Sequence, residues 1–376
     1  MELTLSEDQE LFGETTRRFL GARSPIAAVR EFRYSPDGFE RGSWREGAEL
    51  GWTSLLVPEE LGGGSVSGAG LLDLTIVADA FGRHVAPGPL LPVNVVAAAV
   101  ARAGSEAQQR EVLPGLLDGS TIAAWCVGAP TADGGIATGV SARAAAGGFV
   151  LDGVQEPVEA AAQADLLLVT ARTDAGLAQF LVAPDARGVA IAPLESLDLT
   201  RRFARVELAG VQVPAAAAVG VVGAADADVE RQLELALVIQ AAESVGAAET
   251  VLDFTLEWAF DRYSFGRPLA SYQEIKHRFA DMKTWLEAGH AIAAAAARAV
   301  QHDAADAPEV VSVAAAYIGD YVVELVQDCV QMHGGIGVTY DHDIHLYLRR
   351  VTVNRVLHGT PADHRQRITT LQERAA

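Results

Sequence analysis

The chain has 376 residues, half of them apolar, and 29 basic against 49 acidic side chains give a formal net charge of −20. This length exceeds one simple core, so we expect a soluble globular protein of two or three domains. The acidic balance argues against general binding of nucleic acid or anionic membranes, and an anionic ligand would need local arginines. Cys126 and Cys329 are too few for a disulfide framework, which fits a reducing cytoplasm.

The first 120 residues read as helical. The N-terminus, MELTLSEDQELF, has neither the basic nor the apolar region of a signal peptide, and no apolar run reaches the ~20 residues of a membrane span. Ser6 followed by Gln9 is a capping-box pattern that predicts the start of a helix. A glycine-rich loop, residues 57–70, separates this region from two further helical stretches. We therefore expect an N-terminal helical domain over residues 1–120.

Residues 121 to about 222 alternate between short β-like runs and turns. Seven such runs can be read, and Gly147-Gly148 between two of them is a plausible hairpin turn. This pattern predicts a middle β domain over residues 121–224, with six or seven strands in a small barrel or sandwich.

The helical pattern returns after the β region and lasts to the end of the chain. Long helices are expected over 231–262 and 273–302, and a third from Pro308 to the pair Gly334-Gly335. A fourth is expected over 341–357, and a short fifth follows Pro361. The sequence thus predicts an α+β multidomain fold that ends in a four-helix bundle over residues 225–376.

The stretch RYSFGRPLASYQEIKHRFADM, residues 262–282, reads as two helices with a break between them. Gly266 and Pro268 interrupt the helical pattern, and Pro268 is a candidate to open the next segment. After the break an apolar face recurs at helical spacing: Ile275, Phe279, Met282 and Leu286. That face leaves unexplained why Arg262, Phe265 and Gln273 gather around the break.

Three further motifs have competing readings. The glycine run at 62–70 lacks the Gly-Lys-Ser/Thr ending of a phosphate-binding loop, so a structural loop is expected. QMHGGIG, residues 331–337, fits either a helix C-cap or a bare backbone that a cofactor approaches closely. His342 and His345 could share a helix face, but no second cluster completes a metal site, so no metal is expected.

Four segments together resemble the acyl-CoA dehydrogenase family. VPEELGGG resembles its N-terminal Pro-Glu loop, and VQVP followed by Val219-Gly220 resembles the end of its β domain. The 262–282 stretch resembles its Arg-x-x-Phe-Gly…Gln signature. QMHGGIG followed by HLYLRR resembles its C-terminal signature. The match spans nearly the whole chain.

The resemblance implies FAD as cofactor and gives roles to the unexplained residues. In the family, the equivalents of Arg262, Phe265 and Gln273 bind the adenosine-diphosphate half of an FAD that is bound in a neighbouring subunit. The cofactor-binding set carried over here is Arg262, Phe265, Gln273, Gln331, Gly334, Gly335 and Thr360. An arginine can fork the pyrophosphate, and exposed backbone at a helix break supplies N–H donors. The competing reading is that Arg262 pairs with an acid and Phe265 is core.

The family's catalytic carboxylate has no counterpart at either usual position. The family reaction desaturates an acyl-CoA thioester, with a glutamate as base. Here one base position holds His358 and the other Ala236. His358 could serve as a base, although a loop histidine without that role is the reading we favour. Glu234 and Glu243 share the helix of Ala236, but neither is a convincing substitute.

The positions that would contact the flavin ring also depart from the family. Gly128 stands where a threonine is usual, and Pro157 and Glu159 stand where a tryptophan and a threonine are usual. The residues that would build this chain's own flavin-ring and base site are therefore missing, whereas the residues that would bind the adenosine half of a neighbouring subunit's FAD are present. This division is expected of the non-catalytic subunit of an α2β2 acyl-CoA dehydrogenase.

The partners follow from the same resemblance. A second acyl-CoA dehydrogenase-like subunit would carry the catalytic glutamate, acyl-CoA would be the substrate, and an electron-transferring flavoprotein would be the usual acceptor. Two alternatives stay open. One is a homo-oligomeric flavoenzyme using His358 or another base, and the other is a flavin-free binding protein on this fold.

Overall fold

The computed structural model describes residues 5–131 and 135–375 and begins with a group of helices. These are α1 (Glu7–Arg23), α2 (Ile26–Phe32), α3 (Arg41–Glu49), the 3-10 turn η1 (Glu59–Leu61), α4 (Gly70–His84), α5 (Leu90–Ala103) and α6 (Glu106–Leu117). The capping box is confirmed: the Gln9 backbone N–H donates to the Ser6 hydroxyl, and the Ser6 N–H donates to the Gln9 side chain. The glycine-rich segment before α4 is a loop, as expected.

A mainly antiparallel sheet forms the middle of the chain. Its strands are β1 (Ala123–Cys126), β4 (Val140–Ala145), β5 (Gly148–Glu159), β6 (Leu166–Thr173), β7 (Gly176–Val182), β8 (Val189–Leu194), β9 (Phe203–Pro214) and β10 (Ala218–Val219). They pair in the order β10-β7-β6-β4-β5-β9-β8, and β1 lies parallel to β6. All seven β-like runs are strands, and Gly147, with φ +80°, sits in the β4–β5 hairpin turn.

In the middle part of the chain, the sequence missed three strands of two residues each. One is β10, and the others are β2 (Ala129–Pro130) and β3 (Ile136–Ala137), which pair only with each other. Strands this short have no alternation to detect, because side-chain period can be recognised only over four or more residues. The sheet buries a core of its own, which includes Leu151, Leu167 and Phe180.

The C-terminal half is a helical bundle. It consists of α7 (Asp226–Asp261), α8 (Gln273–Gln301), α9 (Ala307–His333), the turn η5 (Gly334–Val338), α10 (Ile344–Leu357) and α11 (Pro361–Ala375). Two boundaries differ from expectation, since α7 begins before residue 231 and α10 begins after residue 341. Pro268 ends the strand β12 (Arg267–Pro268) and is the N-cap of the 3-10 turn η4 (Leu269–Ser271), and α8 begins at Gln273.

The central helix of the bundle is α7, and the other elements pack around it. By length and composition α7 could cross a membrane, but 89% of its most apolar window is buried inside the fold, as is usual for a core helix. Of the apolar face expected on α8, Met282 and Leu286 are fully buried and Phe279 packs against the core. Ile275, one turn from the helix start, is only half-buried.

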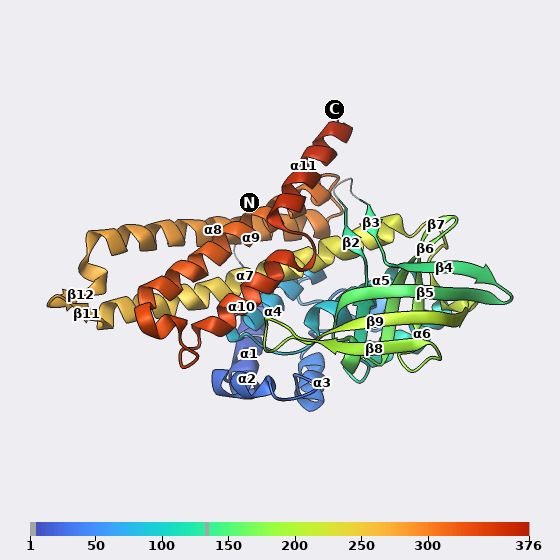
Figure 1. Cartoon of the computed structure of the whole chain (residues 1–376), viewed down its shortest axis with the longest axis horizontal. Coiled ribbons are helices and arrows are strands. Elements are labelled where there is room, and N and C mark those ends of the chain that lie inside the picture. The colour runs from blue at the N-terminus through green and yellow to red at the C-terminus, as the bar shows by residue number, and fades with distance from the viewer. Residues whose placement is uncertain (1–4, 132–134, 376) are drawn as a thin grey trace.

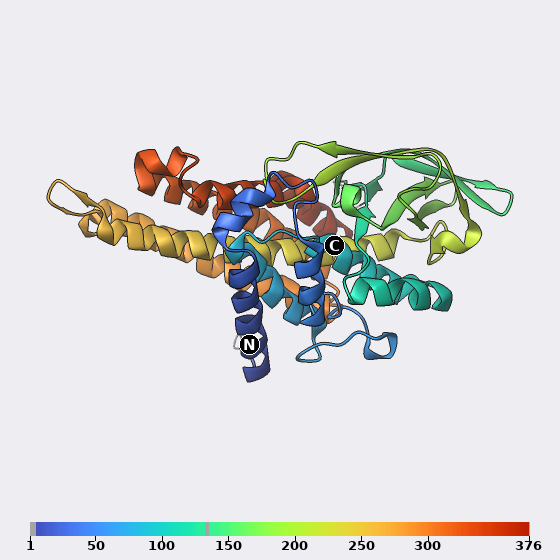
Figure 2. The ribbon, with the colours of Figure 1, turned by 90° about the horizontal axis from the view of Figure 1, so that it is seen from below.

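The elements are arranged along one long axis (Figure 1). The sheet lies at one end, the bundle extends to the other, and α1, α2 and α3 lie beside the middle (Figures 1 and 2). The segment between α7 and α8 projects from the free end of the bundle in both views. The helical, β and helical parts follow one another as the sequence predicted, so the expected fold class is confirmed.

Candidate cofactor-binding site

The break between α7 and α8 is a tight β-hairpin. Its strands are β11 (Tyr263–Ser264) and β12 (Arg267–Pro268), and the two loop residues, Phe265 and Gly266, have φ +50° and +81°. Two positive φ angles are the mark of a type I′ turn. Phe265 is 98% exposed, so a bulky residue holds a left-handed backbone without burying its ring. Strain of this kind, about 1–3 kcal/mol, points to a functional demand on the residue.

Arg262 caps α7 immediately before the hairpin. Its backbone N–H donates to the Trp258 carbonyl oxygen at 2.9 Å, and its guanidinium lies over the Trp258 ring, 5.9 Å from the centroid. Within residues 5–131 and 135–375, no carboxylate forms an ion pair with Arg262. Since Phe265 is also outside the core, the reading of both as ordinary structural residues fails.

The glycine pair after α9 is a helix C-cap at its first residue and open backbone at its second. Gly334 is the C-cap of α9, with φ +64° and its N–H donated to the Gln331 carbonyl. Gly335 has no left-handed φ, and an added Cβ there would meet no atom within 4 Å. Nothing inside the chain therefore requires glycine at 335, and its bare backbone leaves room for an outside group.

The end of α7 and the end of α9 meet at the free end of the bundle. Trp258 stacks on His333, with ring centroids 5.3 Å apart and planes 23° apart. Six of the expected cofactor residues are therefore on one region of the molecule, and all six are exposed. We name this region the bundle-end surface: Arg262, Phe265, Gln273, Gln331, Gly334 and Gly335.

Thr360, the seventh expected residue, lies elsewhere. It follows the far end of α10, where its hydroxyl donates to Asp363 Oδ2 at 2.6 Å and accepts from the Asp363 N–H at 3.3 Å. These two bonds cap the start of α11. The structure thus gives Thr360 a capping role and does not group it with the bundle-end surface.

Four of the five residues that depart from the family pattern meet in one small cavity, and the fifth, Ala236, does not line it. Gly128, Pro157, Glu159 and His358 all line it, although they come from three separate parts of the chain. Its volume is about 70 Å³. We name it the Trp125 cavity, and its lining is Leu91, Pro92, Trp125, Val127, Gly128, Ala129, Gln155, Glu156, Pro157, Glu159, Leu357 and His358.

His358 is enclosed in this cavity rather than open to solvent. It is 9% exposed, and its ring lies 5.4 Å from that of Trp125. Burial, reinforced by the positive charge of Arg201 and by His364, lowers the pKa of His358 to about 3. The imidazole is therefore neutral near pH 7, and so low a pKa makes it a weak general base.

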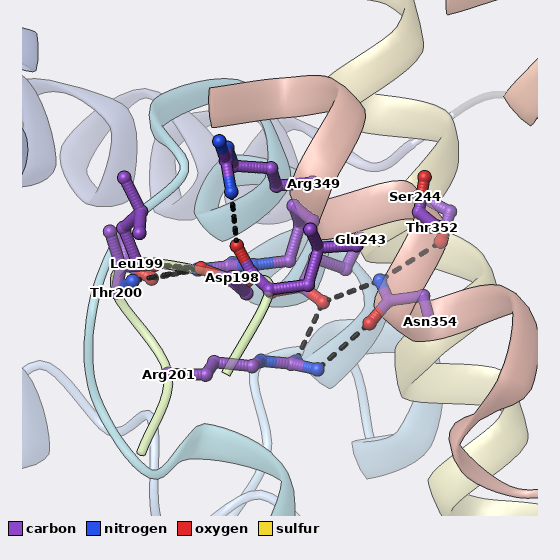
Figure 3. A network of polar contacts seen from close by, with 12 residues as sticks. Asp198, Leu199, Thr200, Arg201, Glu243, Ser244, Arg349, Thr352 and Asn354 are labelled. Carbon is purple, nitrogen blue, oxygen red and sulfur yellow. Dashed lines mark hydrogen bonds and ion pairs between the residues drawn. The ribbon is translucent and has the colours of Figure 1, made fainter. Parts of the chain in front are cut away.

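Glu159, which lines the Trp125 cavity, also belongs to a network of buried charges, and Figure 3 shows the rest of this network. Arg201, on the loop between β8 and β9, contacts Glu159 at 3.3 Å, Glu243 at 2.7 Å and the Asn354 side chain at 2.8 Å. Arg350 binds the other oxygen of Glu243 at 2.6 Å and also pairs with Asp198. The network joins the β domain to α7 and α10.

The charges in this network balance if Glu159 is neutral. Burial raises the pKa of Glu159, against the pull of Arg201. Burial alone would also raise the pKa of Asp198, but the charges of Arg350 and Arg201 hold it below its usual range. Two guanidinium groups then face two carboxylates, which is the arrangement a buried site tolerates.

The other candidate bases are committed to structural contacts. Ala236 is fully buried and has no acid–base group. Glu234 pairs with Arg231 at 3.4 Å, and Glu243 belongs to the network above. Neither glutamate lines the Trp125 cavity.

A side chain at Gly128 would meet the Ala137 carbonyl oxygen at 2.3 Å, so the threonine usual in the family has no room here. The rest of that loop includes residues 132–134, which lie outside the described part of the chain.

The two C-terminal histidines do not form a pair. His342 packs on His333, with centroids 4.3 Å apart, and His345 packs on Tyr340 at 4.3 Å. Over the described residues, no group of three or more His, Cys, Asp or Glu side chains is placed to hold a metal ion.

Sequence reasoning did not identify Trp125, Arg201 or Arg350 as parts of this site. The run LDLTRR, residues 197–202, could have indicated the network. Charged residues between two strands must either pair with a buried group of opposite charge or lie in a solvated loop. Their partners lie on α7 and α10, far along the chain, so spacing could not reveal them.

The fold and the bundle-end surface together define a flavoenzyme-type chain of helical, β and helical parts. The acyl-CoA dehydrogenase N-terminal domain model matches residues 6–120, and the acyl-CoA dehydrogenase C-terminal domain model matches residues 228–370. The chain belongs to the acyl-CoA dehydrogenase family, whose members are oxidoreductases that act on acyl-CoA.

Similar proteins match over their full length. Acyl-CoA dehydrogenase IpdE2 from Mycolicibacterium smegmatis is 30% identical over 367 residues, which is 97% of this chain and 98% of that protein. The solved ChsE4-ChsE5 complex from Mycobacterium tuberculosis contains a chain that is 30% identical, with a TM-score of 0.88 over 100% of this chain and 99% of that one. Butyryl-CoA dehydrogenase from Megasphaera elsdenii shares the fold, with a TM-score of 0.89 and 22% identity. The match covers 99% of this chain and 100% of that chain.

Proposed function

We propose that this chain is the non-catalytic subunit of a flavin-dependent, α2β2 acyl-CoA dehydrogenase. A second acyl-CoA dehydrogenase-like chain supplies the catalytic glutamate and the flavin-ring pocket. The observation that carries the proposal is the division of the site: the bundle-end surface is intact and exposed, whereas the Trp125 cavity has only about 70 Å³ and its His358 is buried.

The bundle-end surface fits one half of an FAD held mainly by another chain. Arg262 offers a guanidinium with no acidic partner in the described structure, and such a group suits a pyrophosphate. The exposed ring of Phe265 offers a stacking face, and Gly335 offers open backbone. FAD, when bound, supplies the hydride acceptor for desaturation. The residues of this chain bind and orient it from outside the reacting centre.

The Trp125 cavity does not fit a flavin ring. Pockets that hold ligands of this size usually have about 300–1,000 Å³, well above the roughly 70 Å³ found here. Among the polar residues that line the cavity, Glu159 pairs with Arg201, and Gly128 cannot carry a side chain. No step of the reaction is therefore assigned to this cavity.

A similar chain supports the two-chain assembly. The ChsE4-ChsE5 structure is described as a complex, and one of its chains is 30% identical to this one. Acyl-CoA as substrate and an electron-transferring flavoprotein as acceptor follow from family membership. The buried free thiols of Cys126 and Cys329, whose pKa values burial raises to about 12, suit the cytoplasmic location we propose.

Two alternatives have less support. A homo-oligomeric enzyme with His358 as base would need an open site and a more basic imidazole than the enclosed one observed. A flavin-free binding protein would have no use for an unpaired Arg262 beside a strained, exposed Phe265.

The test is an arginine substitution at the bundle-end surface of the co-expressed complex. Arg262→Ala should raise the dissociation constant for FAD by about tenfold to a hundredfold, the usual loss of a hydrogen bond to a charged group. Arg267→Ala is the matched control, because Arg267 is on the same hairpin but stacks on Tyr272 at 3.8 Å. Equal FAD affinity in both variants and the wild type would refute the proposal.

A further inference from the structure

Arg30, on α2, connects the N-terminal helices to the segment that follows the glycine pair. Its Nε donates to Asp343 Oδ1 at 2.7 Å, its Nη1 to the Tyr340 carbonyl at 2.6 Å, and its Nη2 to the Asp341 carbonyl at 3.1 Å. One guanidinium thus binds three residues of the 339–343 turn. Figure 2 shows α2 close to this part of the bundle.

The bound segment, residues 334–343, lies mostly at the surface, and its ring contacts are those of His342 and Tyr340. Gly337 is its one fully buried residue among ten, and Val338 is 79% exposed. Its local bonds are those of the η5 turn, such as the Thr339 N–H to the Ile336 carbonyl at 3.0 Å. Segments with few buried contacts open easily unless polar contacts hold them. Arg30 supplies such contacts at the end of the segment.

A second arginine of the same region reinforces the contact. Arg33, the C-cap of α2, lies 4.2 Å from the centroid of the Tyr34 ring and 4.8 Å from that of Tyr340. Tyr340 is therefore held through its carbonyl by Arg30 and through its ring by Arg33. The α2 region therefore contacts the turn through both arginines.

The contact needs the fork of an arginine. Three bonds leave Arg30 from three different nitrogens toward three acceptors. A lysine ammonium is a single point of charge and cannot reproduce this planar arrangement. Asp343 precedes α10 but makes no side-chain cap to that helix, because its carboxylate is bound to Arg30.

We propose that Arg30 is a positioning residue that fixes segment 334–343, so that Gln331 and Gly335 keep the geometry needed to bind FAD at the bundle-end surface. Arg30 itself contacts no cofactor in this account and acts through the 339–343 turn. This inference rests on the proposed function, and it assigns the N-terminal helices a part in cofactor binding.

The test compares Arg30→Ala, Arg30→Lys and the control Arg23→Ala in the co-expressed complex. Arg23 is a half-exposed arginine of α1 that pairs with Glu46, away from the turn. Both Arg30 variants should speed amide hydrogen exchange in 334–343 and raise the FAD dissociation constant roughly tenfold, which corresponds to about 1.4 kcal/mol. The turnover number at saturating FAD should stay unchanged, and Arg23→Ala should behave as wild type.

Each outcome is decisive. Wild-type exchange in 334–343, rescue by Arg30→Lys, or faster exchange with unchanged FAD affinity overturns the inference. The parallel Arg262→Ala measurement separates the two claims. If Arg262→Ala weakens FAD binding but Arg30→Ala does not, the inference alone fails. If neither variant weakens it, the proposed function fails as well.

Discussion

Trp258 stacks on His333 with ring centroids 5.3 Å apart, and this contact joins the last turns of α7 and α9. The Arg262 guanidinium lies 5.9 Å from the centroid of the same Trp258 ring, and Gln331 and Gly334 lie close to His333 in sequence. The two family signatures, far apart in sequence, are therefore joined by this aromatic contact, and Phe254 of α7 also packs on His333.

Replacing Trp258 should disturb both signatures at once. We expect Trp258→Ala to lower the free energy of unfolding by about 1–3 kcal/mol, because the half-buried ring and its stacking contact are lost. FAD affinity of the complex should fall as well. Denaturant titration and flavin binding measure the two effects. Trp285→Ala on α8 is the control, since Trp285 packs on Tyr321 away from this contact, and it should lose stability without losing FAD.

Phe265 is expected to lower the stability of the folded chain while it strengthens FAD binding. Phe265→Asn should raise the free energy of unfolding by roughly 1 kcal/mol, because asparagine accepts a left-handed backbone and the exposed ring contributes no burial. The same change should weaken FAD binding. Tyr263→Asn, on the same hairpin at an ordinary backbone angle, should not stabilise. If Phe265→Asn leaves FAD affinity unchanged, the ring does not contact the cofactor.

Arg350 should be the most sensitive residue of the buried network. It is fully buried and binds Asp198, Glu243 and the Ala86 carbonyl oxygen. Arg350→Met should cost about 3–5 kcal/mol in unfolding free energy, because two carboxylates lose their compensating charge. Its neighbour Arg349, which is not buried, donates only to the Leu197 carbonyl, so Arg349→Met should cost under roughly 1 kcal/mol. Similar losses for both variants would contradict the assignment of the network.

His342 makes the start of α10 sensitive to acid. Its Nδ1 accepts the Ile344 N–H at 3.1 Å, so this nitrogen must be unprotonated. Burial lowers the pKa of His342, and of the two nearby charges Arg30 also lowers it whereas Asp343 raises it. His333, packed on its ring, is likewise a group whose pKa burial lowers.

The sign of the pH effect follows from the lowered pKa. The unfolded chain takes up the proton first, so the stability that His342 contributes is complete above its ordinary pKa of 6.5 and is lost as the pH falls below that value. His342→Asn keeps an acceptor for the Ile344 N–H but cannot titrate. It should therefore lose less stability than wild type between about pH 7 and about pH 5 in denaturant titrations. The exposed His277→Asn is the control, and equal acid sensitivity in all three proteins would contradict the role of His342.

Sequence reasoning reached the parts of this molecule that depend on local pattern. Gly266 and Pro268 located the break between α7 and α8, which the structure shows to be a hairpin, and the seven β-like runs were all strands. The glycine pair was resolved only by geometry, because a cap at Gly334 and an open backbone at Gly335 look alike in sequence. Thr360 was grouped by resemblance, yet its hydroxyl caps α11.

The remaining features arise from contacts between distant segments. The departures at Gly128, Pro157, Glu159 and His358 could be noted one by one, but only packing shows that they line a single small cavity. The same holds for Arg30 and the turn that it binds. Such contacts carry no fixed spacing, so a single sequence does not reveal them.

Flavin content together with native mass tests the central claim most directly. The chain is expressed alone and then with the acyl-CoA dehydrogenase-like protein encoded nearest to it. The account predicts little or no flavin on the chain alone, and a mixed α2β2 tetramer with about one FAD per two chains on co-expression. A yellow tetramer of this chain alone, with about one FAD per subunit, would contradict it and would make His358 the residue to mutate.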